Sequence, residues 1–169
     1  MSLRDELLSD PEAIGYAPMI AAGDHAGIVA RLNLVEPGRT ALVPLTFVTV
    51  RTLVARLGPA GAVLVKKLRA FAAQPDFSPD TDPQSYALHA TVQEMLPFIS
   101  QGDPARGDGV DMGDPGSRAL FSALATIGVI TQDEADSVLA LGTPPCSRAF
   151  QLVGRSVTLN EVSEALNGG

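Results

Sequence analysis

Two capping boxes near the C-terminal end of this 169-residue chain constrain its fold more than any other feature. Each is a threonine followed three residues later by a glutamate: Thr131 with Glu134, and Thr158 with Glu161. In this pattern the hydroxyl and the carboxylate satisfy the free backbone N–H groups at the start of a helix. The stretch 111–167 is therefore predicted to hold several short helices with short connections.

The rest of the chain also indicates short helices, separated by loops rich in glycine and proline. Asp114 followed by Pro115 is a favoured helix start. Elsewhere apolar residues recur every three or four positions, which is typical of helices with one buried face. Hydrophobic residues make up 46% of the chain but aromatic residues only 5%, so aliphatic side chains must fill the core. We predict an all-α fold: a single compact domain of about seven or eight short helices with long ordered loops.

The best internal boundary is the polar segment 74–83, QPDFSPDTDP. A chain of this length is comfortable for one domain and small for two. We therefore predict a single helical domain over 1–169, with possible sub-units 1–73 and 84–169 joined by this linker.

The segment Thr40 to Val50 has two interpretations. It is rich in β-branched residues, which favour a strand. Pro44 interrupts it, however, and Thr46 or Thr49 would make a good N-cap for a helix directly after it. These features favour a helix over 47–57.

An apolar loop is expected over 15–23, GYAPMIAAG. Its side chains Tyr16, Met19 and Ile20 are too apolar to remain in water without cover. We expect them to pack against the body of the domain or to form a partner-binding surface.

The charge of the chain argues against several classes of partner. The net charge is −7, whereas direct nucleic-acid binding and anionic membranes both require a basic face. The basic residues form no cluster beyond Lys66, Lys67 and Arg69. The N-terminus lacks the apolar region of a signal peptide, and no apolar run approaches the ~20 residues of a membrane-spanning helix. Charged residues are only 18%, which suggests that a protein partner covers part of the surface.

Four aspartates crowd one glycine-rich loop, which raises the question of a cation site. They are Asp103, Asp108, Asp111 and Asp114. Their spacing does not match the calcium loop of an EF-hand. A solvated loop that ends in the N-cap Asp114 is the favoured interpretation, and no metal site is expected.

No catalytic or cofactor-binding motif accompanies the reactive side chains. His25 and His89 lack a neighbouring nucleophile motif, and Cys146 is expected to be a buried thiol in a reducing environment. Glycine patterns that cradle nucleotides are absent from the sequence. Arg148 is expected to tie loop carbonyls together or to pair with an aspartate. The sequence therefore predicts no enzyme activity, no catalytic residues and no cofactor.

Both ends of the chain resemble a set of small tailed-bacteriophage and prophage proteins. At the N-terminal end the likeness lies in residues 10–19, DPEAIGYAPM, and in the helix that ends at Arg31-Leu-Asn33. At the C-terminal end it lies in residues 111–115, DMGDP, in the capping box at Thr131 and in Ser147-Arg148-Ala149. After this triplet the chain departs from the common pattern, with Phe150-Gln-Leu-Val-Gly154 in place of a glutamate and a Gly-Leu pair.

This resemblance implies a non-enzymatic structural component of a phage particle, in the neck, tail, baseplate or capsid surface. Such a protein is made in the bacterial cytoplasm and resides in the virion. Its partners would be other virion proteins and, since particle components repeat by symmetry, further copies of itself. The alternatives are a soluble phage or bacterial adaptor or regulator that binds a protein and, less favoured, a small hydrolase-type enzyme.

Overall fold

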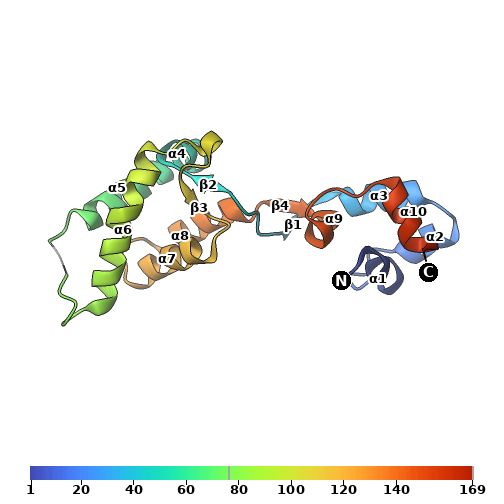
Figure 1. Ribbon diagram of the computed structural model, residues 1–169, viewed down its shortest axis with the longest axis horizontal. Coiled ribbons are helices and arrows are strands. Elements are labelled where there is room, and N and C mark those ends of the chain that lie inside the picture. Colours follow the sequence, from blue (N-terminus) through green and yellow to red (C-terminus); the bar gives the residue numbers. More distant parts are fainter. Residues whose placement is uncertain (76, 169) are drawn as a thin grey trace. The chain divides into compact units, whose positions relative to one another are not determined.

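Helices dominate the computed structural model, which describes residues 1–75 and 77–168 (Figure 1). These residues form ten α-helices, two single-turn 3-10 helices and four short strands. The predicted all-α class is confirmed, with more helices than the seven or eight expected. The chain forms two compact units, one made of 1–41 together with 144–169, and the other of 42–143.

The first unit combines both ends of the chain. Its strands β1 and β4 pair antiparallel, with Val35 opposite Ser147 and Glu36 opposite Cys146. A second link comes from Asn33, whose side-chain amide donates to the Val157 carbonyl and accepts from its N–H. Its elements are α1 (Leu3–Ser9), α2 (Tyr16–Ala21), α3 (His25–Asn33), β1 (Val35–Thr40), β4 (Pro145–Ser147), α9 (Arg148–Val153) and α10 (Leu159–Asn167).

The segment expected to be an apolar loop is in fact the short helix α2. The Asp10 carboxylate accepts hydrogen bonds from the N–H groups of Ile14, Gly15 and Tyr16, and so fixes the turn that leads into the helix. The sequence shows no capping pattern for this helix, because the N-cap is Gly15, which has no side chain, and Asp10 lies six residues before Tyr16. The Tyr16 side chain is fully buried in the core of the first unit, and Met19 and Ile20 are half-buried against the same core.

A chain of ion pairs holds the first unit together. The Arg148 guanidinium donates to both carboxylate oxygens of Glu6, at 2.8 and 2.5 Å, and to Glu12 at 2.6 Å. Glu12 also accepts from Arg39 at 2.6 Å, and Arg39 pairs with Glu36. The expected partners of Arg148, loop carbonyls or an aspartate, are therefore wrong, because the true partners are two glutamates more than 130 residues away in sequence.

The second unit is a helical body around an apolar core. A short antiparallel pair places Phe47 opposite Asp111 and Val48 opposite Val110. Its elements are β2 (Phe47–Val48), α4 (Val50–Leu57), α5 (Pro59–Ala72), α6 (Pro83–Gln101), a 3-10 turn (Pro104–Arg106), β3 (Val110–Asp111), α7 (Pro115–Thr126), α8 (Gln132–Leu139) and a 3-10 turn (Ala140–Gly142).

The helix predicted over 47–57 begins at Val50, because Phe47 and Val48 form a strand. Thr49 caps it, with its hydroxyl accepting from the Thr52 N–H. Helix α5 follows after the single residue Gly58 and packs closely on α4: a Cβ on Gly61 would lie 2.3 Å from the Leu53 carbonyl oxygen. The two helices therefore form a tight hairpin.

Segment 74–83, expected to join two sub-units, connects α5 to α6 inside the second unit. Asp76, within this segment, lies outside the described residues. Among the helices that the structure describes, none is long and apolar enough to cross a membrane.

The predicted helix starts of the second unit are present. Asp114 accepts from the Ser117 N–H at 2.7 Å, and Thr131 and Glu134 form the reciprocal capping box. In the first unit, Thr158 and Glu161 form the equivalent box of α10.

Candidate functional site

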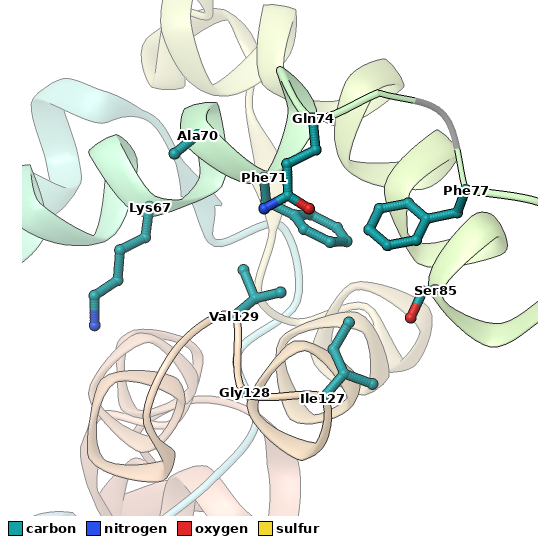
Figure 2. Close-up of a pocket in the computed structure, with 9 residues that line it drawn as sticks. All are labelled: Lys67, Ala70, Phe71, Gln74, Phe77, Ser85, Ile127, Gly128 and Val129. Carbon is teal, nitrogen blue, oxygen red and sulfur yellow. The ribbon is translucent and has the colours of Figure 1, made fainter. Parts of the chain in front are cut away.

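An open hollow of about 420 Å³ in the second unit is the strongest candidate for a binding site (Figure 2). Helix α5 provides one side, the start of α6 and the segment before it provide another, and the turn between α7 and α8 provides the third. A volume in this range is typical of binding sites for small groups. The described residues lining it are Lys67, Ala70, Phe71, Gln74, Phe77, Ser85, Ile127, Gly128 and Val129.

Aromatic rings form one wall of the hollow. The centroids of Phe71 and Phe77 lie 5.6 Å apart, and both rings make edge contacts with His89 at 5.5 and 5.3 Å. Figure 2 shows the two phenylalanine rings side by side, with the side chain of Gln74 next to that of Phe71. Tilted and edge-to-face arrangements of this kind are the favoured geometries for aromatic pairs. This packing holds Phe77, which lies in an otherwise polar segment, against the body of the unit.

An ion pair between Lys67 and Glu134 lies at another edge of the hollow. The Lys67 ammonium lies 2.7 Å from each carboxylate oxygen of Glu134. Burial by itself would raise the pKa of Glu134, but the hydrogen bonds from Lys67 and from the Thr131 N–H prevail and lower it below 4.5. The capping-box glutamate therefore also fixes α5 against α8.

The turn between α7 and α8 supplies the third side. Gly128 has a positive φ of 77°, which reverses the chain at little steric cost. This reversal presents Ile127 and Val129, both half-buried, toward the hollow. The lining thus combines apolar side chains with a few polar groups at the rim.

This arrangement is suited to holding an apolar group in a partly polar frame. The two polar side chains with most chemical potential, Lys67 and Ser85, lie on opposite sides of the hollow in Figure 2. Lys67 is also engaged by Glu134, so it is not poised to activate a hydroxyl. The described lining therefore favours recognition over chemical reaction.

A second, more polar hollow of about 340 Å³ lies in the first unit. Glu12, Glu36, Arg39, Thr40 and Gln151 contribute to its lining. Glu12 and Glu36 both pair with Arg39, and the Gln151 amide donates to the Thr40 carbonyl. Its charges thus already satisfy one another, which makes it a weaker candidate for a ligand.

The reactive side chains considered from the sequence do not meet at either hollow. His25 begins α3 in the first unit, whereas His89 is buried in the second unit between two phenylalanines, with Gln93 as its polar neighbour. Cys146 is buried in β4, and this burial raises the pKa of its thiol. A raised pKa keeps the thiol protonated and unreactive.

Three of the four loop aspartates have structural roles. Asp103 accepts from the Ala105 N–H, and Asp111 accepts from the N–H groups of Leu45, Thr46 and Gly113. The third is the N-cap Asp114. Within residues 1–75 and 77–168, no group of three or more potential ligand side chains is arranged to hold a metal ion.

Of the residues singled out from the sequence, Lys67 lines the hollow. Glu134 contacts this lining through Lys67, and His89 contacts it through Phe71 and Phe77. Tyr16, Met19, Ile20 and Arg148 belong to the first unit. The residues that shape the hollow were missed, although one signal was present: Phe77 is a large apolar residue inside a polar segment. An isolated aromatic residue in such a segment indicates that the segment docks on the body of the protein.

A comparison with protein-family models, curated proteins and solved structures found no match. The function must therefore be inferred from the residues of the chain itself, above all from those that line the hollow.

Proposed function

We propose that this protein is a non-enzymatic structural component of a tailed-phage particle that acts through protein–protein contacts. The observation that carries this proposal is the hollow of the second unit. Its described lining offers aromatic and aliphatic surface, a fixed ion pair and hydrogen-bonding groups at the rim. An apolar centre with a polar edge is the usual anatomy of a protein–protein contact.

The assignment to a phage particle rests on the resemblance of both chain ends to tailed-phage and prophage proteins. In this proposal the chain resides in the virion, in the neck, tail, baseplate or capsid surface, after synthesis in the bacterial cytoplasm. Other virion proteins and further copies of the chain are its partners, and the hollow receives an apolar side chain from one of them.

Mass spectrometry of purified particles, released from a bacterium whose prophage encodes this chain, tests the proposal. The expected result is that peptides of the chain copurify in a fixed ratio to the major capsid protein through successive gradients. Complete and infectious particles that lack the chain would overturn the proposal. A stable complex with a bacterial protein outside the particle would then favour the adaptor or regulator.

A hollow-filling variant links this test to the site. Ala70 is exposed and lines the hollow, so Ala70→Trp places an indole in the space without touching the buried core. We expect it to be excluded from particles. Ala17→Trp, on an exposed position of α2 in the first unit, is the matched control and should be incorporated normally. Equal incorporation of the two variants would remove the hollow from the proposal.

A further inference from the structure

The charges of the second unit are segregated along the chain. Segment 42–75 contains five cations and no acidic residue, whereas segment 70–105 contains five acidic residues and no lysine or arginine. The cations belong to the α4–α5 hairpin, which we call the basic hairpin. They are Arg51, Arg56, Lys66, Lys67 and Arg69.

Three of these cations are available to a partner. Lys67 is bound by Glu134, and Arg69 donates to the Ser100 hydroxyl. Arg51, Arg56 and Lys66 are exposed. None of the three forms an ion pair with another described residue.

Apolar side chains project from the same hairpin among these cations. Val54 is 41% exposed and lies one turn after Arg51, and Val63 is 49% exposed and lies one turn before Lys66. Residues three apart on a helix are surface neighbours. Each exposed valine of the hairpin therefore lies beside an exposed cation on the helix surface.

The hollow carries the complementary features. Phe71, Phe77 and Val129 give it apolar surface among polar groups. Asp82 lies beside it, since the Asp82 carboxylate accepts from the N–H of the lining residue Ser85 at 3.0 Å. Asp80 precedes Asp82 on the same exposed segment, and the two form what we call the acidic rim. In Figure 1, α4 and the segment that carries the acidic rim lie at opposite ends of the second unit.

We propose that the hollow of one copy receives the basic hairpin of a second copy. The exposed Val54 of α4 enters the hollow, while Arg51 and Arg56 of the same helix face Asp80 and Asp82 of the neighbour. Because α4 and the acidic rim lie at opposite ends of one unit, the contact is head-to-tail and repeats into a ring or a filament. This inference rests on the proposed function and names the surface through which copies of such a component associate.

A second copy fits this hairpin better than a nucleic acid does. Nucleic-acid surfaces bind cations without requiring apolar side chains between them, and the net charge of −7 opposes the approach of a polyanion. The same net charge is tolerable between copies because the opposite charges meet at the two ends. Complementary patches of this kind steer association and fix its register.

Charge reversal on each surface tests the proposal. The hairpin variant is Arg51→Glu/Arg56→Glu on α4, and the rim variant is Asp80→Lys/Asp82→Asn, in which asparagine preserves the N-cap of α6. Wild-type protein is expected to form oligomers in sedimentation velocity that weaken with added salt. Each variant alone should associate on the order of 100-fold more weakly, since like charges then face each other. A mixture of the two variants should recover complexes, because the unchanged hairpin of one meets the unchanged rim of the other, and the acidic hairpin meets the rim that now carries a lysine.

The control is Arg31→Glu/Arg106→Glu, which makes the same change in net charge at exposed positions outside the hairpin. It should associate like the wild type. Wild-type protein that stays monomeric at all concentrations, or a hairpin variant that associates like the control, would overturn the inference. So would binding of a DNA duplex by a monomeric wild type that the hairpin variant loses.

The particle experiment tests the proposed function, and the association experiment tests this interface, so each can give a negative result without the other. A chain found in particles but indifferent to charge reversal retains the proposed function and loses this interface. A chain that associates head-to-tail but never enters particles retains the interface and loses the proposed function.

Discussion

The two units solve the problem of a stable interior in different ways. In the first unit the Glu6 side chain is fully buried, and its charge is matched by Arg148, itself nine-tenths buried. In the second unit the completely buried side chains include the apolar residues Leu53, Phe121 and Leu124. The first unit therefore adds a buried pair of charges to its apolar core, whereas the second depends on the fit of apolar side chains.

The difference sets how each unit responds to damage. Removal of one member of a buried ion pair leaves an uncompensated charge, which costs about 3–5 kcal/mol. Removal of methyl groups from an apolar core costs an amount that depends on how far the neighbours can relax. Hydrogen exchange followed by mass spectrometry distinguishes the two, because peptides from each unit report separately.

The largest effect is expected for Glu6→Ala. It leaves the Arg148 guanidinium without its main buried partner, and we expect the first unit to lose about 3–5 kcal/mol of unfolding free energy. Amide protection should fall in peptides of 1–41 and 144–169 and stay unchanged in 42–143. The double variant Glu6→Leu/Arg148→Met removes both charges and should regain much of the loss. If the single variant retains full protection, charge pairing is not what holds this unit.

Leu124→Ala is the matching change in the second unit. Leu124 on α7 is fully buried in the apolar core, so its truncation leaves a cavity and should cost about 2–5 kcal/mol. The expected loss of protection is confined to 42–143. The exposed Leu8, truncated to alanine in the first unit, is the control and should have little effect. Loss of protection in both units would break the distinction drawn between them.

The sequence predicted local features of both units well and long-range contacts poorly. Capping boxes at Thr131 and Thr158 are present, because each needs residues only three apart. The partners of Arg148 could not be found from spacing, since Glu6 lies at the other end of the chain. Arg118 has the role foreseen for Arg148: it donates to the carbonyls of Met112 and Leu139.

The same reason explains what was missed in the second unit. The hollow depends on the approach of Phe77 to Phe71, and on a turn at Gly128 that only the packing of α7 against α8 brings near. Strand β2 was predicted as the start of a helix because its partner β3 lies over 60 residues away. A two-residue strand has no periodicity of its own to reveal it.

Acid titration provides a smaller, paired test of the two units, because each has a capping-box glutamate with a lowered pKa. Arg155 and the N–H and hydroxyl of Thr158 lower the pKa of Glu161 to about 2, and the pKa of Glu134 is also below its usual 4.5. A carboxyl group with a lowered folded pKa stabilises the fold above its unfolded pKa and loses this contribution as pH falls through the folded value.

We therefore expect both helix starts to weaken below about pH 4.5 and Glu161 to stay ionised until about pH 2. Carbon-13 NMR of the glutamate carboxyl groups checks each unit. Lys67→Met should raise the apparent pKa of Glu134 and leave that of Glu161 unchanged. A Glu161 that titrates at an ordinary value would show that its exposed pair with Arg155 is not formed in solution.

The smallest effect is expected for Tyr16→Phe, which removes a buried polar group of the first unit. The Tyr16 hydroxyl is buried and has no hydrogen-bond partner among the described residues. Burial, with the nearby charges of Glu6 and Asp10, raises the pKa of Tyr16, so its hydroxyl remains neutral. A buried hydroxyl without a partner costs free energy, and its removal should leave stability unchanged or raise it by up to about 1 kcal/mol.

Urea denaturation measures this change, and Tyr86→Phe, at an exposed tyrosine of the second unit, is the matched control with no expected shift. The deciding result is whether Tyr16→Phe raises or lowers the free energy of unfolding. A loss of about 1 kcal/mol or more is the usual net contribution of a formed hydrogen bond. Such a loss would mean that the hydroxyl donates to Glu6 or Asp10 in solution, and that a tyrosine, as well as an arginine, holds a carboxylate of the first unit in place.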